Sequence, residues 1–174
     1  AAQALIKAGE IGELLMVHDL RTSDDFLPQR PRWFLQKDQA GGGILMNFGA
    51  HSLDKIIYLT GSPLTQVTGL AGYGNSAVDV DGNAQFFART QNGISATVTL
   101  CGYAVEPINE AMLYGTRGSL RLRTADALFI TRGDGQGFAE VDTSGFEAPF
   151  DAQLSDFIRA IELGAPPPTD GRYG

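Results

Sequence analysis

Apolar and polar residues alternate along much of the chain, and a period of two predicts β-strands. The clearest run covers residues 94–101, in which every second side chain is apolar: Ile94, Ala96, Val98 and Leu100. Shorter or weaker runs predict further strands at residues 14–20, 67–73, 84–90, 110–116, 119–124, 128–131 and 138–141. The strand at 14–20 is apolar on both faces and is expected to be buried. The dipeptides Asn92–Gly93 and Arg117–Gly118 separate neighbouring runs and indicate hairpin turns there.

Three other stretches carry the signals of helices. Residues 1–8 are good helix formers that stop at Gly9, and residues 44–60 are strongly helical until Gly61 and Pro63. Near the end of the chain, apolar residues spaced 3, 1 and 3 apart predict a helix that Gly164 terminates. Between the first strand and the long helix, residues 21–42 are expected to form a loop, and loops of this length often carry function.

Strands in succession, flanked by a few helices, predict an α+β domain: an open, mainly antiparallel β-sheet with helices on one face. The outward set of residues 94–101 is small and uncharged: Ser95, Thr97, Thr99 and Cys101. A face of this kind is either solvated or covered by a partner subunit, and both interpretations stay open at this point.

Composition supports a single folded domain. The chain has 174 residues, of which 43% are hydrophobic and 19% charged, which excludes a disordered chain. Its net charge of −7 argues against nucleic acid and anionic membranes as partners. Because no apolar run approaches 18 residues, we expect a soluble, cytoplasmic protein. The single cysteine, Cys101, is expected to be a small buried residue.

The helix at residues 44–60 carries the candidate chemistry. At about 100° per residue, its polar residues form one narrow stripe: Asn47, His51, Asp54 and Tyr58. The opposite side is apolar: Leu45, Ile56 and Leu59. Asn, His and Asp form helices less readily than the Lys, Glu and Gln that usually fill a solvated stripe. The glycines at 41–43 would also permit a close approach by a ligand, so we favour a functional face over an ordinary solvated one.

His51 is suited to general acid or base catalysis, because an imidazole can take either protonation state near neutral pH. Asp54, three residues further on, could orient that imidazole. A metal site is a weaker alternative, since the only other histidine is His18 and no H-E-x-x-H pattern occurs. A serine hydrolase is excluded by the lack of a G-x-S-x-G elbow.

Residues 33–61, W-F-L-Q-K-D-Q-A-G-G-G-I-L-M-N-F-G-A-H-S-L-D-K-I-I-Y-L-T-G, resemble a known signature. It is the G-G-G-x-L-x-D-x-G-x-H-x-x-D-x-x-x-x-L-x-G pattern of the glucose-fructose oxidoreductase and inositol dehydrogenase family, Gfo/Idh/MocA. G-E-I-G-E-L at residues 9–14, Y-G-T-R-G-S-L at 114–120 and F-I-R-A-I-E-L-G at 157–164 fit the same family.

The resemblance implies a two-domain NAD(P)-dependent oxidoreductase, of which residues 1–174 are the C-terminal substrate-binding and oligomerisation domain. The N-terminal Rossmann domain is absent from this chain, which has no G-x-G-x-x-G motif and no E-K-P motif with the family's catalytic lysine. We therefore expect NAD or NADP in the full-length parent and none bound to this fragment, which by itself should be inactive. The implied partners are a sugar or polyol and further copies of the chain, as a homodimer or tetramer assembled through the sheet.

The resemblance also assigns residue roles. His51 matches the family's acid/base histidine, whereas Asn47 stands where the family has aspartate and cannot accept a proton. Asp54 matches a later acid of the signature, with a supporting role. Three residues that precede the helix could line the sugar site: Trp33, Lys37 and Arg21. The alternative is a non-catalytic sugar-binding or assembly domain that has lost dehydrogenase chemistry, as Asn47 would suggest.

Overall fold

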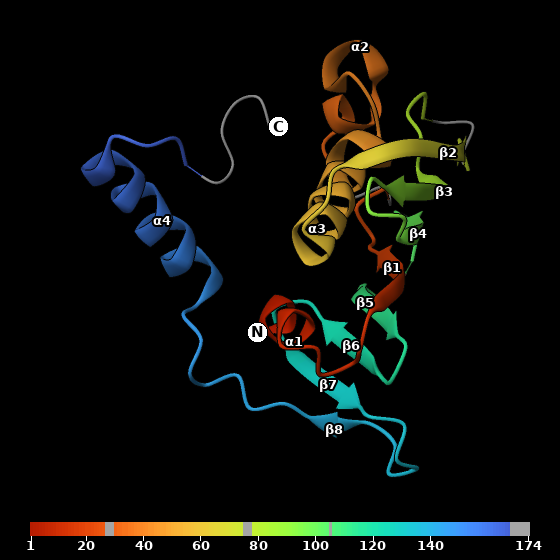
Figure 1. The fold of residues 1–174 in the computed structure, drawn as a ribbon. Helices are drawn as coiled ribbons and strands as arrows, with labels where there is room; N and C mark the ends of the chain where they lie inside the picture. The colour runs from red at the N-terminus through yellow and green to blue at the C-terminus, as the bar shows by residue number, and fades with distance from the viewer. Residues whose placement is uncertain (27–29, 75–77, 105, 168–174) are drawn as a thin grey trace. The chain divides into compact units, whose positions relative to one another are not determined.

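The structure is a computed structural model that describes residues 1–26, 30–74, 78–104 and 106–167. The chain divides into two compact units, Ala1–Val141 and Asp142–Gly174 (Figure 1). The helical elements of the first unit are α1 (Ala2–Lys7), the 3₁₀ turn η1 (Arg32–Leu35), α2 (Lys37–Ala40), the π-helical segment η2 (Leu45–Gly49) and α3 (Ala50–Thr60). Its strands are β1 (Leu14–Thr22), β2 (Leu64–Gly72), β3 (Asn83–Thr90), β4 (Ser95–Cys101), β5 (Ile108–Gly115), β6 (Ser119–Arg123), β7 (Ala127–Thr131) and β8 (Ala139–Glu140).

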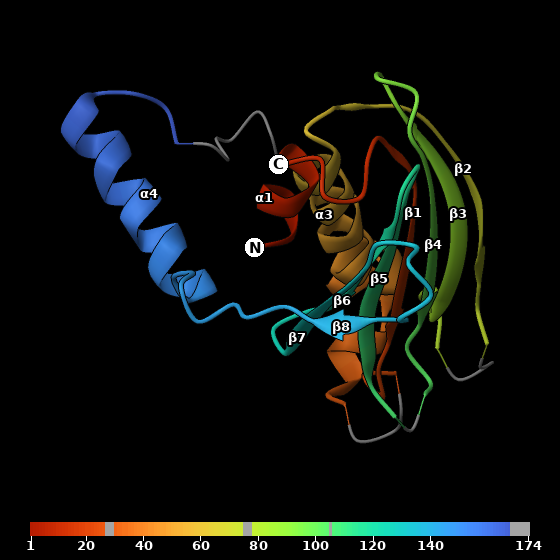
Figure 2. The same ribbon diagram turned by 60° about the horizontal axis from the view of Figure 1, so that its bottom comes forward.

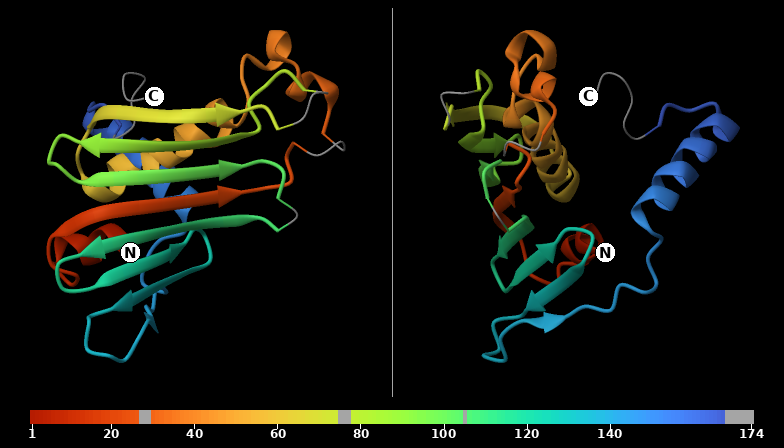
Figure 3. Two further views of the ribbon diagram at one scale, coloured as in Figure 1. Left: turned by 90° about the vertical axis from the view of Figure 1, so that its right-hand side faces the viewer. Right: turned by 180° about the vertical axis from the view of Figure 1, so that it is seen from behind.

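The strands form one sheet in the order β2-β3-β4-β1-β5-β6-β7-β8. Only β1 and β4 run parallel among the neighbouring pairs of the described strands, and the others are antiparallel. Within this unit α1 and α3 lie on one side of the sheet (Figures 2 and 3). The prediction of an open, mainly antiparallel sheet with helices on one face is confirmed.

The core forms between the sheet and α3. All four inward residues predicted for the strand at 94–101 are buried. In the middle of the sheet, Val17 on β1 pairs with Ala96 on one side and Leu113 on the other, and none of the three is more than 1% exposed. Ile56 and Leu59 of α3 belong to the same buried cluster. This packing turns one face of α3 toward the sheet and leaves the opposite face outside the core.

Three burial predictions need correction. The strand at residues 14–20 was expected to be buried, yet Leu15 and Met16 are 53% and 39% exposed. Leu15 lies where the pairing with β5 shifts register, and Met16 points to the open face of the sheet, opposite the buried Val17. Leu45, expected on the buried side of the helix, is 39% exposed. Cys101 is only partly buried, since it faces outward at the end of β4.

The start of the long helix is held by hydrogen bonds to Asp81, a residue from the segment between β2 and β3. The Asp81 carboxylate accepts hydrogen bonds from the backbone N–H groups of Gly43 (2.9 Å) and Leu45 (2.8 Å). Its backbone carbonyl accepts a third from the N–H of Ile44 (2.7 Å). These are donors at the start of a helix, which the helix itself cannot satisfy. At Gly43 the close approach is therefore made by the chain's own Asp81 and not by a ligand.

The helix predicted over residues 44–60 is confirmed in extent, but its first part is not an α-helix. Residues 45–49 form the π-helical segment η2, and regular α-helical geometry starts at Ala50. A π-helical segment bonds residue i to i+5 and makes a wider turn. That wider turn changes the angular position of residues before Ala50, which explains why Leu45 does not share the buried side of Ile56.

The second unit contains the predicted C-terminal helix, α4 (Pro149–Leu163), which ends at Gly164 in the left-handed conformation. Its apolar side chains are exposed, including Leu154, Phe157 and Ile161 at 55–66%.

The close contact between Gly43 and Asp81 should make the stability of the domain sensitive to a side chain at position 43. A Cβ at residue 43 would lie 1.9 Å from the Asp81 carbonyl oxygen, so Gly43→Ala must push the two segments apart. We expect a loss of about 1–3 kcal/mol in the free energy of unfolding, measured by urea denaturation. Gly145→Ala is the matched control, because nothing lies within 4 Å of a Cβ there. An unchanged stability of Gly43→Ala would contradict the structural role assigned to Asp81.

Candidate functional site

The polar stripe of the long helix lies outside the core. The side chains of His51, Asp54 and Tyr58 are exposed on α3, and Asn47 is half-buried in η2. On the other side of α3, Ser52, Ile56 and Leu59 are buried. The His51 ring is therefore available to a molecule that approaches this face, and it does not serve as a core residue.

Arg21 lies near the start of this helix, at the end of β1. Its guanidinium carbon is 3.9 Å from the centre of the Phe48 ring, which is a cation–π contact between β1 and η2. Burial lowers the pKa of Arg21, and the nearby Asp19 carboxylate partly offsets this effect. Arg21 also lines a hollow of about 590 Å³ together with Phe48 and Asn109. A donor-rich side chain at such a hollow can bind hydroxyl or carboxylate oxygens.

The two loop candidates lie at the surface. Trp33, in η1, is 54% exposed and packs edge-on against Phe34, with 5.8 Å between ring centres. Lys37 begins α2 with an exposed side chain, while its backbone N–H donates to Asp79 at 2.7 Å. These contacts do not join either residue to His51. Trp33 is thus accessible rather than a buried anchor, and the structure brings only Arg21 into contact with the long helix through Phe48.

An ion pair that the sequence did not predict holds α3 to the sheet. The Lys55 ammonium donates to Asp19 Oδ1 at 2.7 Å and to Asn109 Oδ1 at 2.9 Å. Asp19 is completely buried on β1, and the Lys55 side chain is 14% exposed. One signal could have revealed the pair: Asp19 occupies the same strand face as the apolar Val17, and a carboxylate at a core position requires a partner.

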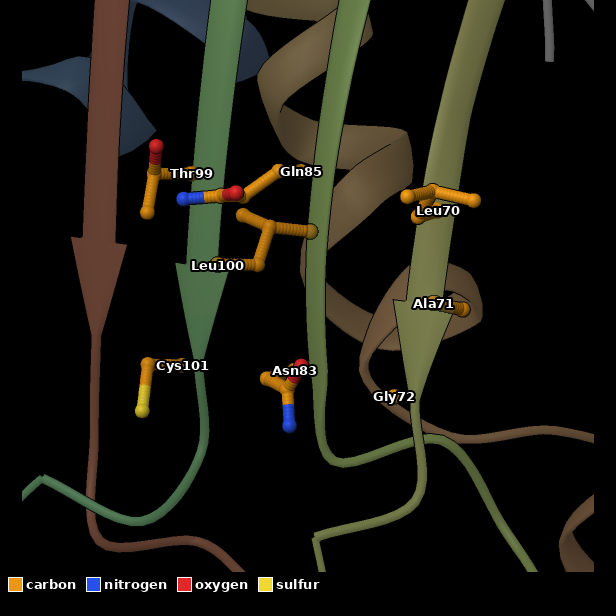
Figure 4. Close-up of a pocket in the computed structure, with 8 residues that line it drawn as sticks. All are labelled: Leu70, Ala71, Gly72, Asn83, Gln85, Thr99, Leu100 and Cys101. Atoms are coloured by element: carbon orange, nitrogen blue, oxygen red, sulfur yellow. The ribbon is translucent and has the colours of Figure 1, made fainter.

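A second hollow, of about 370 Å³, lies on the sheet (Figure 4). The polar side chains Asn83 and Gln85 of β3 stand opposite Cys101 and Thr99 of β4, and Leu70 of β2 pairs with Gln85. In the close-up, α3 lies behind the strands that carry these side chains. This open face also carries Leu70 and Phe87, which are 84% and 68% exposed.

In the ranges given above, no three or more His, Cys, Asp or Glu side chains are grouped so that they could hold a metal ion. The helices of the described part of the chain are all too short or too polar to cross a membrane.

The chain is similar to known proteins in sequence and in fold. A family model described as the GFO/IDH/MocA C-terminal domain matches residues 1–121. A levoglucosan dehydrogenase, solved in complex with NADH and levoglucosan, superimposes with a TM-score of 0.81 at 24% identity, covering 94% of this chain and 53% of that one. The aldose-aldose oxidoreductase of Caulobacter crescentus, complexed with glycerol, gives a TM-score of 0.84 at 23% identity, with 99% and 52% covered. At these identities the likeness shows the fold.

A curated relative extends the comparison to sequence. The 1-carboxy-3-chloro-3,4-dihydroxycyclo hexa-1,5-diene dehydrogenase of Comamonas testosteroni is 30% identical over 111 residues, which cover 64% of this chain and 28% of the relative. The chain therefore spans about half the length of the two solved structures and less than a third of this relative.

Proposed function

The chain belongs to the Gfo/Idh/MocA family, and we propose that it is the substrate-binding and oligomerisation domain of an NAD(P)-dependent oxidoreductase. The substrate is a sugar, a polyol or a related alcohol. The observation that carries this proposal is the exposed polar stripe with His51, on a helix inside the part of the chain that matches the family model. The similar structures include a levoglucosan dehydrogenase that binds NADH and levoglucosan, and an aldose-aldose oxidoreductase. Both proteins support the same chemistry.

Nucleotide binding belongs to another domain of the parent protein. This chain has no glycine-rich loop after a strand that could hold a dinucleotide phosphate, so its residues do not fit that role. A Rossmann domain would bind the nucleotide, which supplies the hydride acceptor. Residues 1–174 would supply the groups that hold the alcohol and move its proton.

His51 is the general base in this scheme. Its exposed imidazole would accept the proton of the substrate hydroxyl as that carbon is oxidised. Asp54, one turn along the same exposed face, would orient the imidazole and stabilise its charged form. Arg21, Trp33 and Lys37 would contact the remaining hydroxyl groups, with Trp33 offering an accessible aromatic face.

Position 47 of this chain carries an amide where the family has an aspartate. An amide can hydrogen-bond a substrate hydroxyl, but it cannot accept a proton or hold a negative charge as an aspartate does. Either His51 acts without a carboxylate partner at position 47, or the parent protein has lost the reaction. Asn47 is thus the observation that favours the second candidate function, a non-catalytic sugar-binding or assembly domain.

The open face of the sheet is the proposed subunit interface. Leu70 and Phe87 are largely exposed there, and small polar residues such as Thr97 surround them. Large apolar side chains that stand exposed on an open sheet face favour coverage by another subunit. We propose a homodimer or tetramer assembled through this face.

A first test uses the full-length parent, screened for dehydrogenase activity against sugars and polyols with both nucleotides. If His51 moves the proton, His51→Ala should lower kcat by about 100-fold or more and change KM little. His18→Ala is the matched control, since His18 lies on β1 away from the stripe. An equal loss of kcat in Asn47→Ala would indicate that this face positions the substrate and does not transfer its proton. A His51→Ala variant that changes KM alone would contradict the role of His51.

A second test addresses the domain assignment. The thermal unfolding temperature of residues 1–174 should not change with NAD or NADP, whereas that of the full-length parent should rise, because only a protein that binds a ligand in its folded state is stabilised by it. Differential scanning fluorimetry with both nucleotides measures this. A clear shift for the isolated domain would overturn the assignment.

A third test concerns the open sheet face. Phe87→Glu introduces a charge into the proposed interface and should convert the oligomer into smaller species in light-scattering measurements. Phe138→Glu, at another exposed phenylalanine that lies outside the strands, should leave the mass unchanged. Dissociation by both variants, or by neither, would argue against this interface.

A further inference from the structure

The Lys55–Asp19 ion pair is buried, where a charged group loses the free energy of its hydration. Asp19 has no solvent exposure and lies on β1, a central strand of the sheet. Lys55 approaches it from α3 and also contacts Asn109 of β5, so that one ammonium joins the helix to two strands. No described residue donates a hydrogen bond to the second carboxylate oxygen, Asp19 Oδ2.

A buried ion pair of this kind is weak evidence for added stability. Two charges lose their hydration when they are buried, and a well-packed apolar pair of similar size often stabilises a protein as much or more. The neighbouring inward residues Val17 and Ala111 are apolar and fully buried, so an apolar residue at position 19 would suit its surroundings. A hydrogen-bonded ion pair is directional, so it allows only one geometry between α3 and β1.

The pair lies beside the proposed catalytic histidine. Lys55 follows His51 by four residues, which is about one turn of α3. On the other side, three residues before His51, Phe48 contacts Arg21. Asp19 and Arg21 are two residues apart on β1 and therefore point to the same face of the sheet. Two contacts with one strand thus bracket His51, and together they fix both the rotation and the axial position of the helix.

We propose that Lys55 is a positioning residue that, through its ion pair with Asp19, holds α3 in the rotation that directs His51 toward the substrate. This inference rests on the function proposed above. Lys55 does not itself touch the substrate in this scheme, and its effect on the reaction passes through the His51 imidazole.

The test uses four variants of the full-length parent. Lys55→Met removes the ammonium but leaves Asp19 buried without a partner, which destabilises a protein strongly. The double variant Asp19→Leu with Lys55→Met removes both charges and so restores stability without restoring the directional link. Lys7→Met is the matched control, because Lys7 is exposed on α1 and donates a hydrogen bond to Gln3 of the same helix, at 3.0 Å. Lys55→Met in the His51→Ala background is the fourth.

We expect Lys55→Met to lower kcat at least tenfold, with the KM for the nucleotide unchanged. The double variant should recover the unfolding temperature but not kcat, and Lys7→Met should keep both. In the His51→Ala background, Lys55→Met should cause no further loss, because residues that act as a unit are not additive. Recovery of kcat together with stability in the double variant would overturn the proposal, as would an equal loss in both backgrounds.

A readout without turnover separates this inference from the proposed function. The imidazole resonance of His51, identified by its loss in His51→Ala, should shift in Lys55→Met and in the double variant but not in Lys7→Met. If the parent has no oxidoreductase activity, the proposed function fails, and this shift still decides whether Lys55 positions His51. An unshifted resonance in the double variant would overturn the positioning role.

Discussion

The candidate site depends on the hydrogen bonds between Asp81 and the backbone at the start of the long helix. The first turn of a helix has N–H groups without partners, and here three consecutive ones donate to a single aspartate from the segment between β2 and β3. Gly43 makes this contact possible because its backbone lies against that of Asp81. The helix start is therefore fixed to the segment that leads into β3, and η2 and α3 continue the chain from that point.

The periodic parts of the fold could be predicted from the sequence. Alternation along β4 identified its buried residues, and helical spacing identified α3 and α4, because these patterns are local and repeat. The features that the sequence did not reveal are contacts between distant residues. Asp81 binds the N–H group of Gly43, 38 residues earlier, and Lys55 contacts Asp19 at a separation of 36 residues. The π-helical turn that exposes Leu45 has no periodic signal either.

The same distinction holds for the candidate site. The stripe with His51 could be found because four polar residues recur on one side of a helix, and the family resemblance assigned roles to three of them, Asn47, His51 and Asp54. How the stripe is held in place could not be found in this way. Phe48 resembles any other apolar helix residue, and only the structure reveals that it packs under the Arg21 guanidinium.

The parallel pairing of β1 with β4 has a consequence for how the chain acquires its fold. Met16 of β1 pairs with Ser95 of β4, and both β4 and β5, the two neighbours of this strand, are encoded far downstream. Such non-local pairing slows folding, because the loop must close before the pairing can stabilise it. During synthesis β1 leaves the ribosome long before either neighbour exists, so of the described strands the central one waits longest for partners on both edges.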